Sequence, residues 1–82
     1  MSLDQIKVGQ QVKIEDLDET GNQHKYLISL GVLPGDILKV VGKGTFGGPI
    51  SCKHENETFF ALRRDYAKKV FVSNITSKKL DS

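Results

Sequence analysis

Hydrophobic and polar residues alternate over residues 11–15, where Val12 and Ile14 are separated by polar positions. Such alternation places one set of side chains on the buried face of a β-strand. Leu17 breaks the alternation, and we therefore expect a β-bulge or the end of the strand near Asp16. A polar loop then leads into the next element.

After this loop the apolar spacing becomes that of a helix. Leu27 and Leu30 are three residues apart, and Ile28 widens the apolar stripe. Thr20 and Asn22 are both suitable N-cap residues, because their side chains can accept a hydrogen bond from the first turn. The pattern predicts a short amphipathic helix that ends near Leu30.

A glycine and a proline predict how this helix ends. Gly31 can adopt the left-handed conformation that commonly follows the last helical residue, and Val32 would then contact the helix. Pro34 cannot continue a helix, and Pro34-Gly35 fits the central positions of a type II turn. The chain would then reverse into a strand over residues 36–41. Its apolar residues on both faces predict a central strand in a closed or covered sheet.

The second half of the chain predicts several short elements. Four glycines between Gly42 and Pro49 indicate a mobile loop. After this loop we expect two strands of a hairpin, a helical turn and a last strand, over residues 50–53, 57–62, 63–68 and 70–73.

These elements predict a mainly β fold. Five short strands in 82 residues would leave two exposed edges in a flat sheet, and curling into a barrel removes most of them. We expect a small SH3-like barrel of five short strands, with a helix inserted between strands 1 and 2 and a short helical turn before the last strand. The chain is short enough for one domain, which we assign to residues 1–75, with a polar, frayed tail over residues 76–82.

Composition narrows the classes of function. No segment approaches the roughly eighteen consecutive apolar residues of a transmembrane helix, and the N-terminal residues lack the basic and apolar regions of a signal peptide. The single cysteine, Cys52, excludes an internal disulfide, and we therefore expect a cytoplasmic protein. Net charge is only +2, yet residues 36–82 carry nine basic residues against five acids, which favours an acidic partner.

A series of short motifs runs through most of the chain. Leu30-Gly31-Val32-Leu33-Pro34-Gly35 is followed by a β run, by a glycine-rich loop that ends at Pro49-Ile50, and by Ala61-Leu62-Arg63 with Ala67. This series resembles the FeoA family, small cytoplasmic proteins associated with bacterial ferrous iron uptake. The residues that carry the resemblance are Leu30, Gly31, Pro34, Gly35, Pro49, Ala61, Leu62, Arg63 and Ala67. One position departs from the family pattern, since Gly48 precedes Pro49 where the family usually has an Asp.

The resemblance implies an SH3-like fold and a role that is not enzymatic, and we expect no cofactor. It also implies a membrane partner, the ferrous iron permease FeoB, which has a cytoplasmic GTPase domain. The expected function is therefore a small cytoplasmic interaction module that docks on this GTPase domain and modulates the permease, without entering the membrane itself. The candidate docking residues are Tyr26, Leu33, Phe46 and Arg64.

Two of these candidates also have a structural interpretation. Phe46 lies among glycines and would either pack on the barrel or be offered to a partner. Arg64 belongs to a basic patch that would contact an acidic protein surface or nucleic acid, or else form a solvated helix in which Arg63 bonds nearby carbonyl groups. The patch comprises Arg63, Arg64, Lys68 and Lys69 around Tyr66.

Two alternative functions rest on other residues. Cys52 and His54 share one face of a predicted strand, which indicates a metal-sensing or metallochaperone domain as an alternative. A dedicated metal site needs three or four ligands at closer motif spacing, so we expect a buried cysteine and no metal site. The second alternative is a nucleic-acid-binding small barrel, which would require a basic stripe interleaved with exposed aromatic residues.

Overall fold

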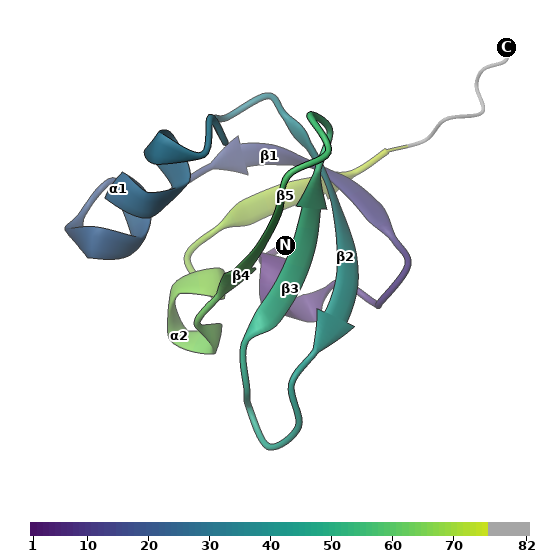
Figure 1. The fold of residues 1–82 in the computed structure, drawn as a ribbon. Coiled ribbons are helices and arrows are strands. Elements are labelled where there is room, and N and C mark those ends of the chain that lie inside the picture. Colours follow the sequence, from purple (N-terminus) through teal and green to yellow (C-terminus); the bar gives the residue numbers. More distant parts are fainter. Residues whose placement is uncertain (76–82) are drawn as a thin grey trace, which may run out of the picture.

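One antiparallel sheet of five strands forms the frame of the molecule (Figure 1). A computed structural model describes residues 1–75, so the tail predicted for residues 76–82 lies outside the described residues. In chain order the elements are η1 (Leu3–Gln5), β1 (Gln11–Asp16), α1 (Gly21–Ser29), β2 (Ile37–Lys43), β3 (Ile50–His54), β4 (Phe59–Leu62), α2 (Arg64–Ala67) and β5 (Phe71–Asn74). The strand order is β4-β3-β2-β1-β5. The predicted mainly β architecture is confirmed, including the helix between β1 and β2 and the helical turn before β5.

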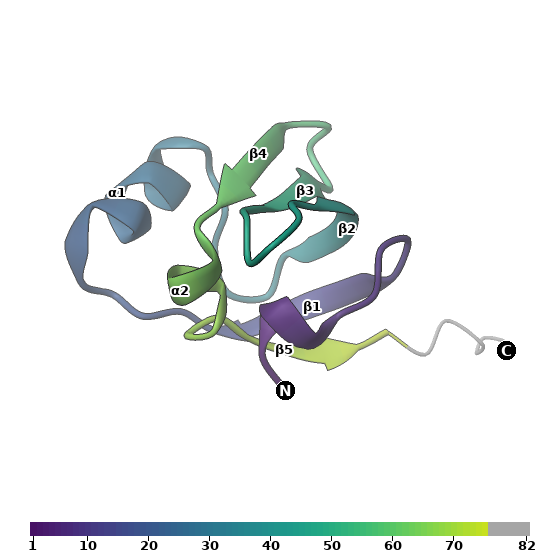
Figure 2. The ribbon, with the colours of Figure 1, turned by 90° about the horizontal axis from the view of Figure 1, so that it is seen from below.

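The sheet curls around the core. β2, β3 and β4 form one side, and β1 and β5 form the other, with η1 and α2 between the two edges (Figure 2). The N-terminal segment covers part of the β5 edge, because the N–H of Val72 donates to the carbonyl oxygen of Met1 at 2.8 Å and that of Leu3 to Val70 at 2.9 Å. These bonds occupy backbone groups that an open edge strand would expose. Within residues 1–75, no helix is long and apolar enough to cross a membrane.

The first strand follows the alternating pattern and carries the predicted bulge. Val12 and Ile14 are buried, and the register between β1 and β5 shifts between Ile14 and Asp16. The extra residue changes which side of the chain faces inward, and Leu17 is accordingly buried as well. The break in the sequence pattern therefore marks a real irregularity of the backbone.

The central strand, β2, is covered on one face only. Leu38 and Val40 are buried, whereas Val41 is partly exposed. The predicted central position is confirmed, and of the two predicted forms, a closed or a covered sheet, the exposure of Val41 fits the closed one, because a curled sheet has a single inner face.

The end of α1 has the predicted glycine cap. Gly31 has a φ of 78°, its N–H donates to the carbonyl oxygen of Ile28 at 2.9 Å, and the N–H of Val32 donates to that of Leu27 at 2.9 Å. Leu27 and Val32 are both buried, which supplies the apolar contact of this cap. Thr20 is the N-cap residue, but its side chain makes no hydrogen bond to the first turn of α1 and instead donates to Oδ1 of Asp18 at 2.8 Å. Ile28 is exposed, so the predicted widening of the apolar stripe is wrong, and Leu27 is the residue of α1 that is buried.

The turn after α1 also has the predicted geometry. The N–H of Asp36 donates to the carbonyl oxygen of Leu33 at 3.1 Å, and Gly35 has a φ of 96°, as in a type II turn. Ile37 begins β2 directly after it. The cap and the turn together direct the chain from α1 into β2, the central strand.

Replacing Gly31 with alanine is expected to lower the free energy of unfolding by about 1–2 kcal/mol, because an L-residue is strained in the left-handed conformation. Space is not the cause, since an added Cβ would have only Asn56 Nδ2 nearby, at 3.9 Å. Gly42 is the matched control: its φ is not in the left-handed region, and the nearest atom, on Ser51, would be 3.7 Å away. Urea unfolding measures both variants, and equal losses would contradict the assignment of the cost to backbone strain.

Candidate functional site

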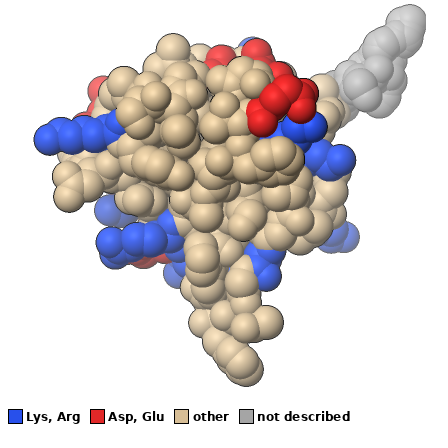
Figure 3. All heavy atoms as spheres, viewed as in Figure 1, with Lys and Arg blue, Asp and Glu red and all other residues tan. Residues whose placement is uncertain are grey.

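Beyond the sheet, β2 and β3 continue into a narrow projecting hairpin (Figures 1 and 3). The N–H of Gly44 donates to the carbonyl oxygen of Pro49 at 2.8 Å, and the N–H of Gly48 donates to that of Thr45 at 3.0 Å. Phe46 and Gly47 occupy the tip with φ values of 53° and 76°, as the central residues of a type I′ turn. The segment predicted as a mobile loop is therefore a hydrogen-bonded turn.

Two glycines let the strands of this hairpin approach each other. A Cβ added to Gly44 would lie 2.9 Å from Cα of Gly48, and a Cβ added to Gly48 would lie 3.0 Å from Cα of Gly44. Both distances are shorter than carbon atoms tolerate without displacement of the backbone. Gly48, the residue that departs from the FeoA pattern, thus has a packing reason in this chain.

The tip of the hairpin presents a large apolar side chain to solvent. The exposed fraction of Phe46 is 106% of the reference value, so the side chain does not pack against the barrel. A bulky residue with positive φ is unusual, and strained residues tend to lie at functional sites. Of the two interpretations drawn from the sequence, packing on the barrel is wrong, and the exposed side chain is free to contact a partner.

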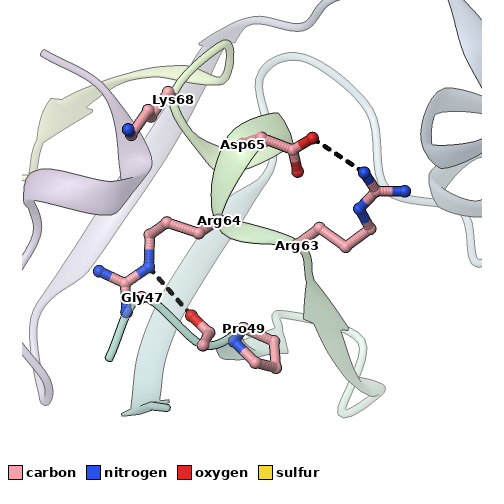
Figure 4. A pocket seen from close by; sticks show the side chains of 7 residues that line it. Gly47, Pro49, Arg63, Arg64, Asp65 and Lys68 are labelled. Atoms are coloured by element: carbon pink, nitrogen blue, oxygen red, sulfur yellow. Dashed lines mark hydrogen bonds and ion pairs between the residues drawn. The ribbon is translucent and has the colours of Figure 1, made fainter. Parts of the chain in front are cut away.

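Arg64, the first residue of α2, holds the base of the hairpin. Its Nε donates to the carbonyl oxygen of Gly48 at 3.0 Å (Figure 4), and its Nη2 donates to that of Gly44 at 3.2 Å. The prediction that Arg63 bonds nearby carbonyl groups with its side chain is wrong. Arg63 instead pairs with Asp65 at 2.9 Å on the exposed surface, and this hydrogen bond lowers the pKa of the Asp65 carboxyl.

A shallow groove of about 520 Å³ separates the hairpin from α2 (Figure 4). Its lining consists of Gly47, Gly48, Pro49, Arg63, Arg64, Asp65 and Lys68. On the surface, Lys and Arg atoms lie on both sides of the base of the projecting hairpin (Figure 3). The groove therefore combines a floor of glycine and proline carbon with a cationic rim.

The four candidate docking residues lie in two places. Phe46 and Arg64 belong to the hairpin and its base, whereas Tyr26 and Leu33 are exposed on α1 and on the turn after it. Figure 1 shows α1 at the side of the molecule, whereas the hairpin projects beyond the lower end of β2 and β3. Tyr66, which the sequence places within the basic patch, is buried, and its hydroxyl donates to the carbonyl oxygen of Asp18 at 2.8 Å.

Cys52 and His54 do share one face of β3, and both are buried. Burial raises the pKa of the Cys52 thiol to about 12, so the thiol stays protonated near neutral pH and is a poor metal ligand. Both ring nitrogens of His54 are occupied: Nε2 lies 2.7 Å from Oδ2 of Asp36, and the N–H of Asn56 donates to Nδ1 at 3.3 Å. Among residues 1–75, no group of three or more His, Cys, Asp or Glu side chains could hold a metal ion.

The bond between His54 and Asp36 was not anticipated from the sequence. Oδ2 of Asp36 also accepts the backbone N–H of Leu33 at 3.0 Å, so one carboxylate joins the type II turn to the end of β3. The available signal was a histidine on the inward face of a strand, because a buried imidazole needs polar partners.

Solved structures of other proteins share the fold of this chain. An iron(II) transport protein A from Clostridium thermocellum superimposes with a TM-score of 0.81 at 28% identity, over 94% of this chain, which spans 47% of that protein. The FeoA protein from Chlorobium tepidum matches with a TM-score of 0.83 at 22% identity, over 99% of this chain and 76% of its own. A manganese-dependent transcriptional repressor shares the fold at 20% identity and a TM-score of 0.79, over 92% of this chain and 41% of its own.

Sequence comparison gives the family. No curated protein matches the chain. The family model described as FeoA domain matches residues 1–74, which is nearly the whole chain. The chain therefore belongs to the FeoA family, as the corner motif and the glycine hairpin indicate.

Proposed function

We propose that this protein is a cytoplasmic, non-enzymatic accessory of bacterial ferrous iron uptake that docks on the GTPase domain of the permease FeoB and modulates it. The proposal rests on one observation above all: a fully exposed Phe46 stands at the tip of a hydrogen-bonded hairpin. A rigid aromatic anchor loses little conformational freedom on binding and can insert into a pocket of the partner. Family membership supplies the link to iron transport.

Tyr26 and Leu33 are candidates for a second, separate contact. Both are exposed apolar side chains beside the glycine cap, and an interface that uses both surfaces would have to extend from α1 to the hairpin (Figure 1). The hairpin is the better candidate, because the structure holds it in place through Arg64 and two backbone bonds.

Replacing Phe46 with asparagine is expected to weaken binding to the soluble GTPase domain at least tenfold, measured by isothermal titration calorimetry with and without guanine nucleotide. Asparagine tolerates the left-handed conformation, so the melting temperature should stay the same or rise slightly. Leu33→Asn is the comparison variant for the second surface. Full affinity of the Phe46 variant would exclude the hairpin as the docking site, and a wild-type protein that does not bind would refute the proposed function.

A further inference from the structure

The groove between the hairpin and α2 carries positive charge that the described residues do not neutralise. Arg63 pairs with Asp65, but no ion pair within residues 1–75 involves Arg64 or Lys68. The hydrogen bonds of Arg64 go to carbonyl oxygens, which leave its charge uncompensated. In Figure 4, the charged groups of Arg64 and Lys68 lie on the same side of α2, and the Arg63–Asp65 pair lies on the other.

Arg64 also keeps capacity for a ligand. A guanidinium has five N–H donors, and two of them are used on the hairpin carbonyls, which leaves three. Arginine and lysine side by side suit a carboxylate, since one can bond it directly while the other adds charge. Beside them, the glycine backbone and the ring of Pro49 give the groove an apolar floor.

We propose that this groove binds an acidic segment of the partner protein, with an Asp or Glu carboxylate at Arg64 and Lys68 and an adjacent apolar side chain over Pro49. This inference rests on the proposed function and specifies its contact. Two uncompensated cations are few for a nucleic-acid backbone, where affinity depends on many phosphate contacts. A groove with an apolar floor next to an exposed aromatic tip fits a peptide segment better.

Lys68→Glu is the test variant, because the side chain of Lys68 makes no hydrogen bond or ion pair among the described residues and its replacement leaves the hairpin contacts of Arg64 intact. The matched control is Lys39→Glu, which changes net charge equally. Lys39 faces Lys53 across β2 and β3, so a glutamate there gains an oppositely charged neighbour.

In calorimetry with the soluble GTPase domain of the permease, Lys68→Glu is expected to lower affinity about tenfold and Lys39→Glu less than twofold. The affinity of the wild-type protein should fall as salt rises from low to physiological concentration, and that of Lys68→Glu should depend on salt less steeply. If Lys68→Glu keeps its affinity while Phe46→Asn still weakens binding, the groove does not bind the partner, and the proposed function stands.

A second probe keeps the two proposals separable. A ten-residue peptide of glutamate and leucine is titrated into the protein and followed by amide chemical shifts, with the glutamine and leucine peptide as its control. Shifts at Gly48, Arg64 and Lys68 with the acidic peptide alone support the groove, even if the GTPase domain fails to bind. No shift with either peptide, or a steeply salt-dependent complex with a DNA or RNA oligonucleotide at these residues, would overturn it.

Discussion

Replacing Asp36 with alanine is expected to lower the free energy of unfolding by about 2–4 kcal/mol and the melting temperature by roughly 10–30 °C. Oδ2 of Asp36 accepts hydrogen bonds from Nε2 of His54 and from the backbone N–H of Leu33. His54 is only 4% exposed, so the variant leaves a buried N–H without a partner. Such a donor costs about 1–3 kcal/mol, and the lost bond within the turn adds roughly 1 kcal/mol. Thermal and urea unfolding followed by circular dichroism measure the change.

Two further variants show whether the buried bond is the cause. Asp36→Asn keeps an acceptor oxygen for His54, so we expect it to recover about half of the lost stability. Glu57→Gln breaks the exposed ion pair with Lys53, at 3.0 Å, and should change stability by less than about 0.5 kcal/mol. If Asp36→Ala unfolds at the same urea concentration as the wild type, the bond contributes nothing and this explanation fails.

The same pair predicts a pH dependence of stability. Burial lowers the pKa of His54, but the hydrogen bonds with Asn56 and Asp36 and the negative charges of Asp36 and Glu55 together outweigh it, so the pKa lies above its ordinary value. The extra stability is therefore fully present below the unfolded pKa of about 6.5, and it is lost as pH rises through the folded pKa. In Asp36→Ala the hydrogen bond and the charge of Asp36 no longer raise the pKa of His54, so the gain in stability at acidic pH should be smaller than in the wild type. If the free energy of unfolding of this variant depends on pH as steeply as that of the wild type, the pairing of His54 with Asp36 is contradicted.

The sequence predicted the corner after α1 well because each residue there has a local backbone requirement. Gly31 and Gly35 take positive φ values, and Pro34 fixes the turn between them. Such requirements act over four or five residues and do not depend on distant partners. By contrast, the exposure of Ile28 and Val41 depends on which faces the curled sheet covers, and local spacing cannot determine this.

The candidate site was predicted only in part for the same reason. Phe46 could be predicted as a candidate docking residue because a large apolar residue is unusual among glycines, and this signal is local. The role of Arg64 requires the start of α2 to meet the base of the hairpin, sixteen to twenty residues away along the chain. Sequence reasoning therefore assigned the carbonyl contacts to the neighbouring Arg63, since nothing local distinguishes two adjacent arginines.

Replacing Gly44 with alanine is expected to weaken binding to the GTPase domain at least tenfold while the barrel core stays folded. The added Cβ would lie 2.9 Å from Cα of Gly48, so the two backbones must separate. Separation breaks the bond between Gly44 and Pro49 and displaces both carbonyl groups that Arg64 holds. The amide of Gly48, which bonds Thr45, should then exchange with solvent faster, whereas the amide of Val40 in the central strand should not.

The matched control for this variant is Gly47→Asn, at the tip of the same hairpin. An added Cβ there has no atom within 4 Å, and asparagine tolerates the φ of 76°. We expect its amide exchange at Gly48 and its affinity to stay within about twofold of the wild type. If Gly44→Ala exposes the Gly48 amide to solvent but binds the GTPase domain with normal affinity, the partner does not need an ordered hairpin. The docking surface must then lie elsewhere, and Tyr26 and Leu33 are the next candidates.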